Sequence, residues 1–240
     1  MHESNLLVST KWLKNHLEAP DLKILDASWY LPTENRKPEI EYDNCHIPGA
    51  MFFDIDEVSD LDSDLPHMLP IPEKFASRVK ALGIGDGHRV IVYDGHGLFS
   101  AARVWWMFKV FGFSDVAVLD GGLPKWKEEG FQVSNTPKSI QNHHFTARKN
   151  SLMIANFRDV SEASSKGLAQ IIDARSPERF SGKVAEPRPG LRSGHIPGSI
   201  NLCFKDLLNE DRTLKSNFHL KNVFDSSGID LNEPIITTCG

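Results

Sequence analysis

The chain has 240 residues, of which 40% are hydrophobic and 25% are charged, and these values exclude a disordered or fibrous protein. A formal net charge of −5 gives no basic surface that would favour nucleic acid or an anionic membrane as a partner. The start of the chain lacks a secretory signal, no 18-residue apolar stretch occurs, and three cysteines without paired spacing argue against a disulfide framework or a zinc site. A cytoplasmic globular protein is therefore expected.

The first half of the chain alternates short apolar runs with helical patterns, which is typical of a parallel sheet flanked by helices. Strands are predicted at 22–26, 90–93 and 116–119. Apolar residues spaced by four, four and three between 71 and 82, with Pro72 near the start and Gly83 after the end, predict an amphipathic helix. A second helix, at about 100–111, is apolar on more than one side and is expected to cover the sheet.

The second half repeats motifs of the first half. Asp-Ala follows a predicted strand at Asp26 and again at Asp173, and His-Ile-Pro-Gly begins at His46 and again at His195. Such like-spaced matches indicate a duplication. We therefore predict an α/β protein with two tandem domains, each a parallel sheet flanked by helices, at 1–135 and 151–240, joined by a linker at 136–150. The Ser, Asn, Thr and Gln content of the linker predicts a solvated connection.

The elements of the second half are expected at 171–173 (strand), 216–224 (helix) and 234–238 (strand). Aligning the last strand with 90–93 places Cys239 opposite Asp94. A further helix and strand follow Asp94, whereas one residue follows Cys239. By its own repeat, the chain is expected to lack roughly the last third of its second domain, and a protein ending at Gly240 is expected to be less stable than an extended one.

Cys239 is the first candidate for chemistry. It follows a predicted parallel strand, at the sheet edge where open α/β sheets place ligand sites. A loop that begins here and leads into a helix can direct backbone N–H groups inward and stabilise a thiolate, which is a usable nucleophile. The alternative is an ordinary buried cysteine.

Several motifs together resemble the tandem-domain rhodanese superfamily over residues 7–240. They are the repeated Asp-Ala and His-Ile-Pro-Gly, Ser-Ala-Ala-Arg-Val-Trp-Trp-Met from Ser100, Asp-Gly-Gly from Asp120, and the terminal Thr-Cys-Gly. The resemblance implies that only the second domain has the catalytic cysteine, here Cys239. It also implies that the first domain, with Asp94 at the equivalent position, is catalytically silent.

Two groups of this family differ after the cysteine. Thiosulfate sulfurtransferases typically continue with Arg and Lys, whereas 3-mercaptopyruvate sulfurtransferases continue with Gly, Ser, Gly, Val and Thr, so Gly240 favours the second group. The resemblance implies that Gly240 belongs to the substrate-binding loop. It further implies that Arg179 and Arg188 hold the carboxylate and keto group of mercaptopyruvate, a role suited to the planar guanidinium. The alternative is that either arginine is a surface ion-pair partner.

Two further residues match the mercaptopyruvate group. The resemblance implies that Asp56 and His67 form a charge-relay set with a serine that would follow Gly240. A neutral histidine beside a carboxylate can accept or return a proton during thiol chemistry. The alternative for His67 is a histidine that makes hydrogen bonds between the domains.

The resemblance implies a two-step reaction. Sulfur would pass from 3-mercaptopyruvate to a persulfide on Cys239 and then to cyanide, a small thiol or thioredoxin, in a monomer without metal or organic cofactor. Three alternatives stay open: a thiosulfate sulfurtransferase, a noncatalytic rhodanese-like binding module, and a phosphatase of the same fold. A chain that ends at Gly240 is expected to have little activity.

Overall fold

The structure is a computed structural model that describes residues 6–141, 143–188 and 190–239. The chain divides into two compact units. Unit 1 extends to Ser151 and includes Asp211–Thr213, and unit 2 consists of Leu152–Glu210 and the chain from Leu214 onward. Within the described ranges, no helix is long and apolar enough to cross a membrane.

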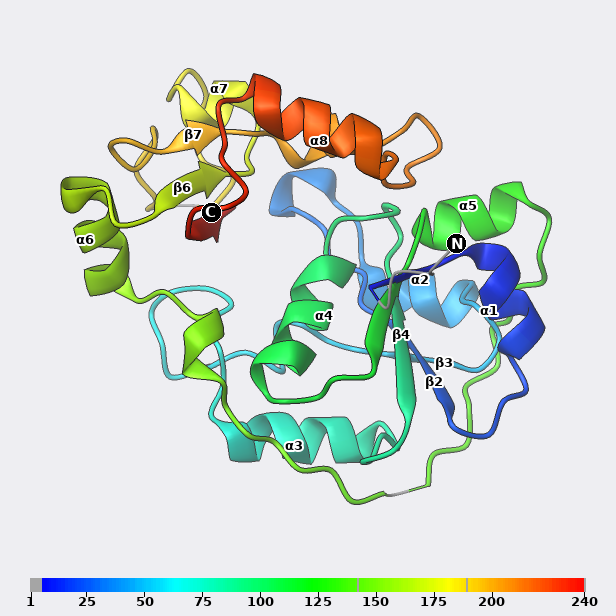
Figure 1. Ribbon diagram of the computed structural model, residues 1–240. Coiled ribbons are helices and arrows are strands. Elements are labelled where there is room, and N and C mark those ends of the chain that lie inside the picture. The colour runs from blue at the N-terminus through cyan, green and yellow to red at the C-terminus, as the bar shows by residue number, and fades with distance from the viewer. Residues whose placement is uncertain (1–5, 142, 189, 240) are drawn as a thin grey trace. The chain divides into compact units, whose positions relative to one another are not determined.

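Unit 1 contains a parallel sheet with the strand order β1-β5-β4-β2-β3 (Figure 1). Its strands are β1 (Leu7–Val8), β2 (Leu22–Asp26), β3 (Ala50–Phe52), β4 (Arg89–Tyr93) and β5 (Val116–Leu119). Its α-helices are α1 (Thr10–His16), α2 (Pro38–Asn44), α3 (Pro72–Ala81), α4 (Ala101–Val110) and α5 (Gly122–Glu128), and a short 3₁₀ turn occurs at Pro32–Glu34. A second 3₁₀ turn, Ser151–Met153, includes Ser151 of unit 1 and the first two residues of unit 2. The predicted strands and helices of the first half are confirmed, with β4 starting one residue earlier than expected.

Two hydrophobic layers enclose this sheet. Successive residues of a strand point to opposite faces, so Leu25 packs with α3 and α4 on one face while Ile24 packs with α1 and α5 on the other. Figure 1 shows these helices on either side of the strands. Burial on both faces explains the continuous apolar runs of β4 and β5, since a strand covered on both sides has no polar face.

One residue of the segment predicted as a solvated linker packs into the core of unit 1. Phe145 is 2% exposed, and its ring stacks on Phe113 with centroids 5.5 Å apart. Just before the segment, the backbones of His46 and Ser134 exchange hydrogen bonds of 2.8 Å. Most of the described residues of 136–150 are exposed, as expected of a solvated connection, whereas Phe145 is buried.

Unit 2 contains a parallel sheet with the order β7-β6-β8. Its elements are α6 (Phe157–Lys166), β6 (Gln170–Asp173), α7 (Pro177–Phe180), β7 (Ile200–Asn201), a 3₁₀ turn at Phe204–Leu207, α8 (Asn217–Ser226) and β8 (Ile235–Thr238). The two strands and the helix predicted here are confirmed within two residues. Ile172, Leu202 and Ile229 form the buried core, against which Val223 and Phe224 of α8 pack.

Strand register confirms the alignment of the two halves. In unit 1, Asp26 at the end of β2 pairs with Tyr93 at the end of β4. In unit 2, Asp173 at the end of β6 pairs with Thr238 at the end of β8. The residues that follow β4 and β8, Asp94 and Cys239, therefore occupy equivalent positions.

Candidate active site

Cys239 lies at the carboxyl edge of the unit 2 sheet, directly after β8. The carbonyl of the preceding Thr238 accepts a 2.8 Å hydrogen bond from the N–H of Ala174, the residue that follows β6. This bond holds the chain before Cys239 beside the end of β6. Cys239 is exposed, whereas Cys203 is buried and Cys45 is half-buried. Its position and exposure make the thiol accessible to a ligand at this edge.

The end of β6 begins a chain of buried opposite charges. Arg175 contacts the Asp173 carboxylate at 2.6 Å and the Glu186 carboxylate at 2.8 Å. It also donates a 2.7 Å hydrogen bond to the carbonyl of Gly194. Arg179 in turn forms an ion pair with the second oxygen of Glu186. The order of charges is therefore Asp173, Arg175, Glu186, Arg179, from the sheet outward.

Glu186 is the buried centre of this charge network, with a side chain only 2% exposed. Burial opposes ionisation, but the hydrogen bond and positive charge of Arg179, with the charge of Arg175, outweigh it, so the pKa of Glu186 lies below its usual value. Arg179 is 21% exposed and uses Nε and Nη2 for Glu186. The guanidinium is thus oriented by a bidentate contact while part of it faces solvent.

The remaining residues predicted to bind substrate lie in the same unit or outside the described chain. Arg188 is half-buried in a bend that follows Glu186 by two residues. Gly240 lies outside the described residues. Of the residues of unit 2 that were predicted to bind substrate, Arg179 is therefore the one whose orientation the charge network explains.

The structure brings Asp56 and His67 of unit 1 together. His67 Nε2 lies 2.5 Å from Asp56 Oδ1, and the His67 side chain is 17% exposed. The indole N–H of Trp29 donates a 3.2 Å hydrogen bond to Asp56 Oδ2. Since a carboxylate oxygen accepts, Nε2 of His67 is the ring nitrogen that carries the proton in this contact.

The loop after β4 shows what the equivalent edge of unit 1 contains. Asp94 is 1% exposed, and its two carboxylate oxygens accept 2.7–2.8 Å hydrogen bonds from four backbone N–H groups of the loop, those of His96, Gly97, Phe99 and Ala101. Gly97 has φ of 120°, a conformation that glycine adopts without a Cβ clash. These four N–H groups are therefore already bound to a carboxylate of the chain itself.

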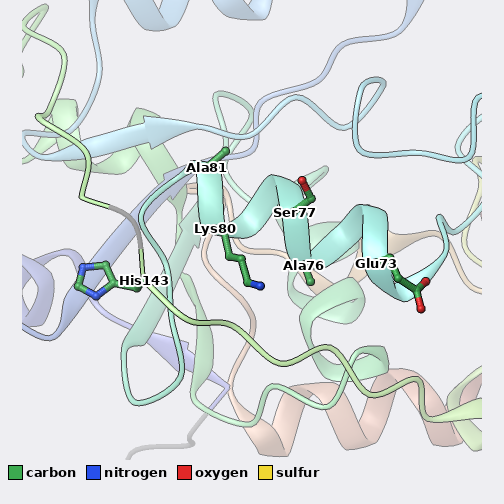
Figure 2. Close-up of a pocket in the computed structure, with 6 residues that line it drawn as sticks. All are labelled: Glu73, Ala76, Ser77, Lys80, Ala81 and His143. Atoms are coloured by element: carbon green, nitrogen blue, oxygen red, sulfur yellow. The ribbon is translucent and has the colours of Figure 1, made fainter.

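A surface pocket of about 560 Å³ lies elsewhere on unit 1. Figure 2 shows its lining, which consists of the exposed face of α3 and one histidine: Glu73, Ala76, Ser77, Lys80, Ala81 and His143. No predicted site residue borders it. Across the part of the chain that the structure describes, no group of three or more His, Cys, Asp or Glu side chains could hold a metal ion.

Three residues of these contacts were missing from the sequence-based site: Trp29, Arg175 and Glu186. Arg175 and Glu186 stand within the motif that contains Arg179, and the alternation of charges after Asp173 was a signal for a network. Trp29 had no such signal, because its partner Asp56 is 27 residues away along the chain.

Comparison with known proteins gives a consistent result. The rhodanese-like domain family matches residues 9–129 and 157–240. The chain is 43% identical, over 99% of its length, to thiosulfate/3-mercaptopyruvate sulfurtransferase 1, mitochondrial, of Arabidopsis thaliana, of which it covers 68%. It is 40% identical, over 98% of its length, to 3-mercaptopyruvate sulfurtransferase of Homo sapiens, of which it covers 81%.

Solved structures agree with these relatives. The crystal structure of SseA from Escherichia coli, described as a 3-mercaptopyruvate sulfotransferase with the rhodanese fold, superposes with a TM-score of 0.91 at 39% identity. The match covers 99% of this chain and 89% of that one. The two rhodanese-like segments and the parallel sheets flanked by helices confirm the predicted fold. The relatives are named as sulfurtransferases, and they confirm the predicted family. The chain belongs to the rhodanese family of sulfurtransferases, as a member with two rhodanese-like domains.

Proposed function

We propose that this chain transfers sulfur from 3-mercaptopyruvate to a thiol acceptor through a persulfide on Cys239. One observation supports this most directly. An exposed cysteine follows β8 at the carboxyl edge of a parallel sheet, and the neighbouring strand β6 ends in a network that orients Arg179. A nucleophile and an oriented guanidinium in one unit suit an anionic donor of sulfur.

The first step forms an S–S bond and breaks a C–S bond. The Cys239 thiolate attacks the sulfur of 3-mercaptopyruvate, and the electron pair of the C–S bond leaves on carbon as the enolate of pyruvate. The proton lost by the substrate thiol balances the proton gained at that carbon. The products are pyruvate and a persulfide on Cys239.

Arg179 and Arg188 are proposed to bind the carboxylate and keto oxygen of the donor. For Arg179 the support is its bidentate contact with Glu186, which orients the guanidinium while leaving it partly exposed. A carboxylate that binds there would exchange water for charge-assisted hydrogen bonds. The same arginine would also stabilise negative charge on the departing enolate.

Asp56 and His67 are proposed to move the proton in this step. Nε2 of His67 contacts Asp56, and Nδ1 is the nitrogen proposed to accept the proton from the substrate thiol and to return it to the enolate carbon. The pair then ends the step in the state in which it began.

The second step transfers the outer sulfur of the persulfide. An acceptor thiolate attacks this sulfur, the S–S bond breaks, and Cys239 regains its thiolate. A small thiol or the thiol of thioredoxin would become a persulfide, and cyanide would become thiocyanate. Thiosulfate is the alternative donor, since a relative at 43% identity is named for both donors and thiosulfate is also an anion that Arg179 could bind.

Mass spectrometry after exposure to 3-mercaptopyruvate tests the proposal. One added sulfur atom is expected at Cys239, together with release of pyruvate. Cys239→Ser should abolish both, whereas Cys45→Ser, which changes a half-buried cysteine of unit 1, should change neither. Pyruvate release by Cys239→Ser at the unmodified rate would refute the proposal. Faster labelling of Cys239 by thiosulfate than by 3-mercaptopyruvate would favour the alternative donor.

A further inference from the structure

Contacts within unit 1 hold the pair formed by Asp56 and His67. Trp29 approaches it from the segment after β2, with its indole N–H on Asp56 Oδ2 at 3.2 Å. Its ring also meets the His67 ring edge to face, with centroids 4.9 Å apart and an interplanar angle of 83°. One side chain therefore contacts both members of the pair.

Helix α4 anchors both sides of this arrangement. The backbone N–H of Trp29 donates a 3.1 Å hydrogen bond to the hydroxyl of Ser100, which precedes the helix. Arg103 on the first turn donates to the backbone carbonyl of His67 and lies over the Trp106 ring at 4.7 Å. Since α4 is largely buried in the core, these contacts attach the pair of Asp56 and His67 to a rigid element.

The backbone of His67 is unusual, with φ of 57°, a region that few residues other than glycine occupy. Such a conformation persists where surrounding contacts hold it. The contact of Arg103 with the carbonyl of His67 meets this need. Asp56 itself is mostly exposed, with 65% of its side chain accessible, and the N–H of Trp29 adds a hydrogen bond that restrains its carboxylate.

We propose that Trp29 is a positioning residue for the reaction, a conclusion that rests on the proposed role of Asp56 and His67. Its N–H occupies Asp56 Oδ2, so that Oδ1 faces His67 Nε2 and accepts its proton. His67 is thereby kept in the tautomer that carries its proton on Nε2. Trp29 acts through Asp56 and does not itself need to contact the substrate.

Trp29→Phe tests this, because it keeps an aromatic ring and removes the N–H donor. The expected result is a kcat for pyruvate release lowered about tenfold with KM within about twofold, the size of one hydrogen bond to a charged group. In the Asp56→Asn background the same change should have no further effect. Trp12→Phe, which changes another partly exposed tryptophan of unit 1, is the matched control and should leave kcat unchanged.

A spectroscopic readout separates this proposal from the proposed function. The Nε2 proton of His67 should exchange with water at least about tenfold faster in Trp29→Phe than in the unmodified protein or in Trp12→Phe. Equal exchange in all three would overturn the positioning role. The positioning role would also be overturned if Trp29→Phe lowered kcat as strongly in the Asp56→Asn background as in the unmodified protein. Faster exchange in Trp29→Phe combined with full activity of Asp56→Asn would support the positioning contact and refute the role of the pair in sulfur transfer.

Discussion

The ends of β4 and β8 occupy equivalent positions in the two units but present different chemistry. Asp94 after β4 is buried, and the four N–H groups of the following loop are bound to its own carboxylate. Cys239 after β8 is exposed. At one strand end, the loop N–H groups therefore bind a carboxylate of the chain itself. At the other, an exposed thiol can meet an anion from solution. The duplication placed both outcomes in one protein.

The neighbouring strands differ in the same sense. Asp26 at the end of β2 accepts hydrogen bonds from Ser28, whereas Asp173 at the end of β6 forms an ion pair with Arg175. The Ser28 hydroxyl donates to the Asp26 carboxylate and accepts only a neutral hydrogen bond, from the backbone N–H of Gly95, among the contacts described. An arginine has donors left over, and these lead on to Glu186 and then to Arg179. Ser28 and Arg175 each stand two residues after the aspartate that ends a strand. The choice of serine or arginine at this position decides between local hydrogen bonds and an ion network that reaches solvent.

The largest expected effect concerns Asp94. Asp94→Ala removes the acceptor of four loop N–H groups, and we expect the free energy of unfolding of unit 1 to fall by about 3–5 kcal/mol. Urea denaturation followed by tryptophan fluorescence measures this. Asp60→Ala, in the same unit, removes a carboxylate that accepts the turn N–H of Asp62, and it should cost less than about 1 kcal/mol. Equal costs for the two variants would contradict the assignment of Asp94 as the group that organises its loop.

The next effect concerns the network of unit 2. Arg179→Lys keeps the charge beside Glu186 but loses the bidentate fork, so we expect KM for 3-mercaptopyruvate to rise about tenfold with kcat within about twofold. Steady-state pyruvate release measures both constants. Arg158→Lys, at a surface arginine that is 85% exposed, is the control and should change neither. An unchanged KM in Arg179→Lys would show that Arg179 serves only the ion pair.

The smallest effect distinguishes the two strand-end aspartates by pH. Burial, with a smaller contribution from the charge of Asp94, raises the pKa of Asp26 from 3.8 to about 6, against the opposing hydrogen bonds from Ser28. Between these values the folded protein binds a proton that the unfolded chain does not. The free energy of unfolding should therefore gain about 1 kcal/mol from this group as the pH falls from about 7 to about 5.

Asp26→Asn isolates that contribution, because the amide does not titrate. Urea denaturation of both proteins at the two pH values measures the change in the free energy of unfolding. As the pH falls, this free energy should rise by about 1 kcal/mol more in the unmodified protein than in Asp26→Asn. The other carboxylates titrate alike in both and cancel in the difference. The same pH dependence in both proteins would show that Asp26 is already ionised at the lower pH.

Local patterns were sufficient to predict the elements that place the site. Apolar periodicity and turn residues predicted the strand before Cys239 and the helix between Pro72 and Gly83. The repeat predicted the equivalence of Asp94 with Cys239. Asp56 and His67 were singled out by resemblance, and the structure brings them to 2.5 Å. Their catalytic roles stay predictions that the experiments above address.

Contacts between distant parts of the chain were outside the reach of those patterns. Phe145 reads as an isolated apolar residue in a polar linker, yet it stacks on Phe113 in the core of unit 1. Trp29 reads as a residue after a strand, yet its N–H meets a carboxylate 27 positions later. Both contacts depend on the path of loops, and loop paths are set by the packing of the whole unit and not by local composition.

The sequence by itself determined the duplicated α/β architecture and the place of Cys239 at a sheet edge, because strand periodicity and chain punctuation are local properties. Only the tertiary structure decided how the charges are used. It paired Arg179 with the buried Glu186 and closed the loop of unit 1 around Asp94. The physical reason is that a buried charge must find its partners wherever the fold places them, since leaving it without them would cost more than the fold can offset.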